Sequence, residues 1–179
     1  MTVLCKPDEC TLLLIDLQAR LMPAIRDGDA VVRRCVQLAT AARELGIPVI
    51  GTEQNPAGLG ALVADIAPLC ETTLTKFHFS APAEEGFLQR LPAGRDTLVV
   101  AGCEAHVCVF QTVAGLIESG RAVKWVADAV GSRHPHDRLS ATERARALGA
   151  DVVTTEMVIF EWLGTSQHAK FDRLLQLVR

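Results

Sequence analysis

The chain has 179 residues, of which 49% are hydrophobic and 22% are charged, a composition typical of globular proteins rather than of disordered or fibrous ones. This length suits one domain, so we expect a single domain over residues 1–179. The net charge of -3, without any basic block, argues against a nucleic-acid partner or an anionic membrane surface and leaves a small molecule as the expected partner.

Neither a membrane span nor a secretory leader is expected. The longest apolar runs, such as Thr11–Ile15 and Thr97–Ala101, are far too short to cross a bilayer. The N-terminus carries acidic residues before its apolar run and no small-residue cleavage site after it, so we expect a cytoplasmic protein. Most of the six cysteines lie inside apolar segments, which favours free thiols, and no pair has the spacing of a zinc knuckle.

Strand and helix patterns alternate from the start of the chain. The run Thr11–Asp16 is short and aliphatic, which predicts a strand buried on both faces of a parallel sheet. Apolar residues at helical spacing over Ala30–Leu45 predict a helix that Gly46 ends. The stretch Pro48–Gly51 predicts the next strand, which leads into the Gly- and Pro-rich loop EQNPAGLGA.

The second half of the chain repeats this alternation. Strands that alternate with helices imply right-handed crossovers and a central parallel sheet with helices on both faces, an α/β fold of three layers. In such open sheets, ligands bind beyond the carboxyl ends of the strands, so we expect the chemistry there. The predicted elements are strands at Thr97–Ala101, Ala122–Val126 and Asp151–Thr154, and helices at about His106–Ser119, Asp137–Leu148 and His168–Val178.

Asp16 is the first candidate for chemistry. It follows four aliphatic residues, where the first predicted strand gives way to a polar segment. A carboxylate at such a position costs free energy unless it has a partner or a role. Because Asp is also common at turns and helix caps, Asp16 taken alone does not indicate catalysis.

Cys108 and Lys76 are the other two candidates. Cys108 lies in the predicted first turn of a helix, where backbone N–H groups and the helix dipole favour a thiolate, so we expect a lowered pKa for this thiol. The alternative is a buried structural cysteine. Lys76 follows a run of threonines that suggests a short extended segment and precedes Phe77 and Phe79. A lone lysine on most surfaces is simply solvated.

Three segments in this order resemble the isochorismatase-like cysteine hydrolase superfamily. They are LLLIDLQ around Asp16, TLTKFHFSA around Lys76 and VVAGCEAHVCVFQT around Cys108. The resemblance covers nearly the whole chain, and TEQNPAGLG is similar to the branch of isochorismatase-domain proteins. It implies a Rossmann-like fold of the isochorismatase type, with three α-β-α layers.

The resemblance also implies a mechanism. Asp16 would act as general base on the Cys108 thiol and later as proton donor to the leaving group. Lys76 would hold the carboxylate and the thiolate in place by its charge. A non-proline cis peptide would join Cys103 to Glu104 and aim the backbone amides of Glu104 and Cys108 at a developing oxyanion.

Two departures from the family pattern narrow the activity. Metal-containing nicotinamidases of the superfamily carry an Asp-x-His motif after the second strand, where this chain has GTEQNP, so we expect neither a metal nor another cofactor. True isochorismatases lack a cysteine at the position of Cys108, which makes acyl transfer a better expectation than vinyl-ether hydrolysis. The sequence thus predicts a metal-independent hydrolase that cleaves a small amide or related C–N bond through a covalent thioester (acyl-enzyme) intermediate.

Two other functions stay open at this point. The same scaffold could cleave another bond, for instance in a pterin-like or isochorismate-like compound, or it could be a binding or scaffold protein without turnover. Candidate pocket residues can be named from their positions, although each could equally be a satisfied polar group or a core aromatic. They are Gln18, Gln54, Phe79 and His106.

A homo-oligomer, either a dimer or a larger assembly, is expected in addition. The segment VTTEMVIFEWLG places six large apolar residues within Met157–Leu163, after the last predicted strand. Methionine and aromatic residues are enriched at subunit contacts, and closed symmetric assemblies are common. The alternative is that this segment covers the core of its own subunit.

Overall fold

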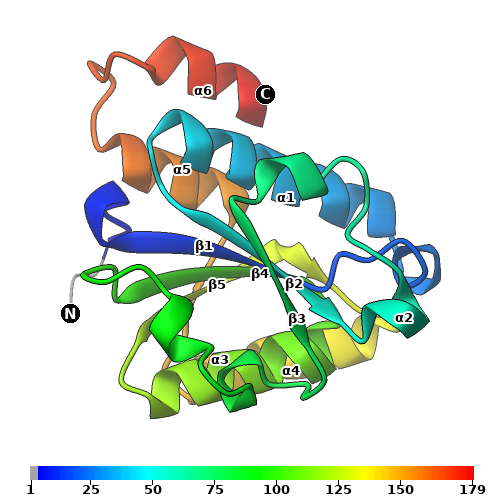
Figure 1. Ribbon diagram of the computed structural model, residues 1–179. Coiled ribbons are helices and arrows are strands. Elements are labelled where there is room, and N and C mark those ends of the chain that lie inside the picture. The colour runs from blue at the N-terminus through cyan, green and yellow to red at the C-terminus, as the bar shows by residue number, and fades with distance from the viewer. Residues whose placement is uncertain (1–3) are drawn as a thin grey trace.

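The computed structural model describes residues 4–179, and a parallel sheet of six strands forms its centre (Figure 1). The strand order in the sheet is β3-β2-β1-β4-β5-β6, so the chain begins in the middle, runs to one edge, and returns beside β1 to build the other half. The change of direction between β1 and β4 is the place where such sheets form ligand-binding crevices. The strands are β1 (Cys10–Ile15), β2 (Val49–Gln54), β3 (Thr72–Lys76), β4 (Thr97–Cys103), β5 (Ala122–Gly131) and β6 (Asp151–Val153).

Helices cover both faces of this sheet, which confirms the expected three-layer fold. Figure 1 shows α1, α5 and α6 on one face and α3 and α4 on the other. The α-helices are α1 (Gly28–Glu44), α2 (Pro56–Leu59), α3 (Phe110–Glu118), α4 (Pro135–Ala147), α5 (Thr155–Leu163) and α6 (Phe171–Val178). Shorter turns are η1 (Pro7–Glu9), η2 (Met22–Ala24), η3 (Ala67–Leu69), η4 (Ala81–Ala83), η5 (Leu88–Arg90) and the π-helical turn η6 (Ala105–Val109).

The core consists of two apolar clusters separated by the sheet. Successive side chains of a strand point to opposite faces. In β1, Leu12 and Leu14 therefore join the cluster under α1 and α5, whereas Leu13 and Ile15 join the cluster over α3 and α4. Because all residues of β1 and β4 are buried, their sequences are apolar almost throughout, which is the signal that predicted them.

The structure corrects the prediction that the segment VTTEMVIFEWLG forms a subunit contact. It forms α5, whose first turn is capped by the Thr154 hydroxyl, which accepts a hydrogen bond from the backbone N–H of Met157 at 3.4 Å. Only Met157 among its large apolar residues is strongly exposed, at 47%. The argument that this segment is a subunit contact is therefore wrong, because its side chains fill the core of their own subunit. Those buried are Val158, Ile159, Trp162 and Leu163.

Three other observations complete the fold. The strand expected over Ala122–Val126 continues to Gly131, and this extension pairs with the end of β4 past an irregularity in the register. All six cysteines are free thiols. No helix within residues 4–179 combines the length and apolarity needed to cross a membrane.

Candidate functional site

Asp16, Lys76 and Cys108 meet at the carboxyl ends of the strands. Asp16 directly follows β1, Lys76 ends β3, and Cys108 lies in η6, just beyond β4. Lys76 Nζ forms an ion pair with Asp16 Oδ2 at 2.7 Å, and the charges of both side chains act on the Cys108 thiol, Asp16 raising its pKa and Lys76 lowering it. The exposed fractions of the three residues are 0%, 1% and 7%. Three segments distant in the sequence thus place an acid, a base and a thiol in one buried cluster.

The backbone turns sharply at Asp16. Its φ of 49° lies in the left-handed region, which Asp adopts more readily than most residues. The neighbouring strand supports this turn, since the Asp16 N–H donates to the carbonyl of Thr52 at 3.2 Å and the Thr52 hydroxyl donates to Asp16 Oδ1 at 2.7 Å. The sequence analysis missed Thr52, because a single threonine in an apolar strand carries no local signal of such a contact.

The ammonium group of Lys76 is held on several sides. Besides Asp16, Nζ donates to Gln54 Oε1 at 2.7 Å and to the carbonyls of His78 and Phe79 at 3.4 and 3.3 Å. A lysine that is 1% exposed is not the solvated surface residue of the alternative interpretation. The Asp16 carboxylate balances its charge, and protein oxygens replace water as hydrogen-bond acceptors for its ammonium group.

The pKa of the Cys108 thiol is raised to about 12, which contradicts the expectation of a lowered value. Burial is the main cause and the negative charge of Asp16 is the second, while the positive charge of Lys76 acts in the opposite direction. The dipole argument failed because it ignored how deeply this turn is buried beside a carboxylate. The thiol is therefore protonated near neutral pH, and it needs a base that removes its proton during attack.

The peptide bond between Cys103 and Glu104 is cis, as the family resemblance implies. The Glu104 side chain is held by Arg133, whose backbone N–H and Nε donate to Glu104 Oε2 at 3.2 and 3.1 Å. This contact ties the start of η6 to the connection between β5 and α4. The carboxylate of Glu104 is thereby engaged, which leaves its backbone as the part available for chemistry.

Comparison with known proteins agrees with this geometry. The family model of the isochorismatase domain matches residues 10–157. The chain belongs to the isochorismatase-like hydrolases. Isochorismatase domain-containing protein 2 of Xenopus laevis is 36% identical over 169 residues, which cover 93% of this chain and 82% of that protein. Isochorismatase domain-containing protein 1 of Salmo salar is also 36% identical, but the match spans only 59% of its length, against 92% of this hydrolase.

Solved structures of related proteins share the fold of this hydrolase. The MAR1 ribonuclease of Caenorhabditis elegans superposes with a TM-score of 0.92 at 34% identity, over 98% of this chain and 92% of that one. YcaC of Pseudomonas aeruginosa, solved with hexane-2,5-diol and covalent acrylamide, gives 0.91 at 26% identity, over 99% and 92%. YcaC of Escherichia coli, described as an octameric hydrolase of unknown specificity, gives 0.91 at 26%, over 99% and 91%.

Two of the four candidate pocket residues of this hydrolase, Gln18 and Gln54, form hydrogen bonds that hold Lys76. Gln18 Oε1 accepts from the Gln54 N–H at 2.8 Å, and Gln18 Nε2 donates to the carbonyls of Gln54 and Gly60 at 3.1 and 2.6 Å. Gln54 Oε1 accepts from Lys76, and Gln54 Nε2 donates to the carbonyl of Phe77 at 2.8 Å. Both side-chain amides thus have protein partners, and together they fix the lysine.

The other two candidates, Phe79 and His106, have different partners. Phe79 is 51% exposed and contacts Lys76 through its backbone carbonyl. His106 Nδ1 lies 3.0 Å from Ser132 Oγ, in the connection between β5 and α4, and its Nε2 lies 3.8 Å from Asp137 Oδ2, in the first turn of α4. The structure therefore joins Phe79 to the lysine segment and places the His106 ring in a separate polar group.

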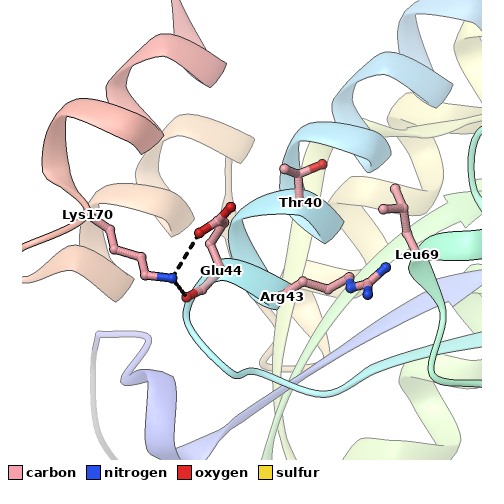
Figure 2. Close-up of a pocket in the computed structure, with 5 residues that line it drawn as sticks. All are labelled: Thr40, Arg43, Glu44, Leu69 and Lys170. Atoms are coloured by element: carbon pink, nitrogen blue, oxygen red, sulfur yellow. Dashed lines mark hydrogen bonds and ion pairs between the residues drawn. The ribbon is translucent and has the colours of Figure 1, made fainter.

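A surface hollow of about 400 Å³ lies away from this cluster, beside the end of α1 (Figure 2). There Lys170 Nζ contacts the carbonyl oxygen and Oε2 of Glu44 at 2.5 and 2.9 Å, and Lys170 holds the pKa of the Glu44 carboxyl below its usual value. None of the predicted site residues lines this hollow. Within residues 4–179, no group of three or more His, Cys, Asp or Glu side chains has the geometry to hold a metal ion.

Proposed function

We propose that this hydrolase cleaves a small amide or a related C–N bond, without a metal, through a covalent intermediate on Cys108. The observation that carries the proposal is the buried ion pair between Asp16 and Lys76 beside a buried thiol, on which both charges act. An anionic base, a fixed cation and a nucleophile in one buried cluster are the parts that covalent catalysis by a cysteine needs.

Acylation begins with a protonated thiol. As Cys108 Sγ attacks the carbonyl carbon of the substrate, its proton moves to the Asp16 carboxylate, and the carbonyl oxygen becomes an oxyanion. The tetrahedral intermediate then collapses, the C–N bond breaks, and Asp16 returns the proton to the leaving nitrogen. The amine departs neutral and a thioester remains on Cys108.

Two further groups serve this step. The backbone amides of Glu104 and Cys108 donate to the oxyanion, which stabilises charge that develops only in the transition state. The ammonium of Lys76 stabilises the negative charge as it passes between the carboxylate and the sulfur. Because Gln54 and two backbone carbonyls hold this ammonium, it need not reorganise during the reaction.

Deacylation reverses the proton transfers. Water attacks the thioester carbon and gives a proton to Asp16, and the C–S bond breaks to release a carboxylic acid. The proton on Asp16 then returns to the Cys108 sulfur. The acrylamide bound covalently in the YcaC structure of Pseudomonas aeruginosa supports a covalent route for this chain and suggests a probe.

The test measures how fast acrylamide labels Cys108 as a function of pH, with peptide mass spectrometry to locate the adduct. If Asp16 removes the thiol proton, the labelling rate has a plateau across about pH 6–8. Cys70, half-buried with a pKa of about 11, is an internal control whose rate rises about tenfold per pH unit. Asp16→Asn should abolish the Cys108 plateau.

Turnover is tested with a panel of small primary amides. Cys108→Ala and Asp16→Asn should each abolish hydrolysis, and the double variant should be little worse than either, because both residues act in one step. A Cys108 labelling rate that rises with pH like that of Cys70, or hydrolysis retained by Cys108→Ala, would show that the proposed chemistry is wrong.

We further propose that the subunit is a single domain and that the protein acts in the cytoplasm as a homo-oligomer. The octameric YcaC of Escherichia coli supports the proposed assembly.

A further inference from the structure

Thr52 contacts Asp16 at two points. Its carbonyl accepts from the Asp16 N–H at 3.2 Å, and its hydroxyl donates to Asp16 Oδ1 at 2.7 Å. The pairing of β1 with β2 places Thr52 opposite Ile15, immediately before the turn at Asp16. Thr52 is fully buried, so water does not compete for this hydrogen bond.

These contacts leave the carboxylate of Asp16 with a fixed orientation. Thr52 holds Oδ1 and Lys76 holds Oδ2, the latter at 2.7 Å. A group bound at both oxygens cannot rotate about its last side-chain bond without losing a partner. The hydroxyl must be the donor, because an ionised carboxylate has only acceptor sites.

We infer that Thr52 is a positioning residue for the proton transfer between Cys108 and Asp16. Its hydrogen bond to Oδ1 sets the direction in which Asp16 accepts the proton. The inference rests on the proposed function, since it assumes that Asp16 is the base. It adds a residue that contacts neither the substrate nor the sulfur in that scheme and acts through the base.

Thr52→Val removes the hydroxyl and keeps the shape of the side chain. In the acrylamide assay, we expect the plateau of Cys108 to be lowered about tenfold, because Asp16 loses one of its two anchors. Thr52→Ser, which retains the donor, should restore most of the plateau. A purely structural effect of Thr52→Val would also change the labelling rate of Cys70, which should stay the same in both variants.

Thr11→Val is a matched control. Thr11 is also fully buried in the sheet, and its hydroxyl has no hydrogen-bond partner among the described residues. The same substitution there should leave the pH profile of Cys108 unchanged. Urea unfolding of each variant confirms that it is folded under assay conditions, and Thr52→Ala replaces Thr52→Val if the valine variant does not fold.

The Asp16→Asn variant distinguishes failure of the proposed function from failure of the role inferred for Thr52. If this variant keeps the wild-type plateau, Asp16 is not the base, and both the proposed function and the role of Thr52 are wrong. If Asp16→Asn loses the plateau while Thr52→Val keeps the wild-type profile, only the role of Thr52 is wrong. A lowered plateau in Thr52→Val that serine does not restore, or that Thr11→Val reproduces, also overturns the inference.

Discussion

Replacement of Lys76 by methionine should destabilise the fold strongly, because it leaves the Asp16 carboxylate buried without its cation. The two charged atoms lie 2.7 Å apart, and both residues are almost completely buried. With an effective dielectric constant of about 20, their Coulomb attraction is about 6 kcal/mol, part of which offsets the cost of burying the charges. Removal of one partner from such a pair typically costs about 3–5 kcal/mol, a large share of a total stability of about 5–15 kcal/mol.

The assay is urea unfolding at neutral pH, followed by the fluorescence of Trp125 and Trp162, which are both buried in the core. Lys6→Met is the control, since Lys6 is an exposed residue paired with Glu9 at 3.2 Å, and its loss should cost less than about 1 kcal/mol. Lys76→Met combined with Asp16→Asn should recover part of the stability, because no unpaired charge remains. A loss below about 1 kcal/mol for Lys76→Met, or a double variant no more stable than Lys76→Met, would refute this reasoning.

Three further predictions follow from other parts of the molecule. Gly102→Ala should prevent folding, because a Cβ at this residue, whose φ is +120°, would lie 2.1 Å from the carbonyl oxygen of Ile15. Gly94→Ala, which has open space around it, should only lower the melting temperature. Equal melting temperatures of the two variants would contradict this prediction. Because the pKa of Cys108 is raised in the folded protein, the thiol of the unfolded chain ionises at lower pH, and the free energy of unfolding should fall as pH rises from about 9 toward 12. In urea unfolding, Cys108→Ala should make this fall with pH smaller. An unchanged fall would contradict the raised pKa of Cys108. Light scattering should give a multiple of the 19.3 kDa subunit, whereas a monomer at micromolar concentration would contradict the proposed oligomer.

The sequence alone determined the layers of the fold and the positions of the candidate site residues. Strands buried on both faces need continuous apolar runs, so β1 and β4 could be recognised without any knowledge of their neighbours. Asp16 occurs where such a run gives way to polar sequence, Lys76 ends a threonine-rich extended segment, and carboxyl ends of parallel strands share one edge of the sheet. Their proximity could therefore be predicted before a distance was known.

Only the tertiary structure decided how these groups affect one another. Thr52 reaches Asp16 through the register of β1 with β2, and Gln54 reaches Lys76 across the neighbouring strand pair. No local pattern encodes contacts between residues that are 36 and 22 positions apart in the sequence.

The pKa of Cys108 and the burial of α5 also depend on tertiary packing. The helix dipole could be inferred from sequence position, but burial and the charge of Asp16 outweigh it and reverse the direction of the shift. The apolar residues of α5 suggested a contact surface when considered along the chain, yet α1 and the sheet bury them. Burial is set by what packs against a segment from elsewhere in the chain, so it becomes known only when the chain has folded.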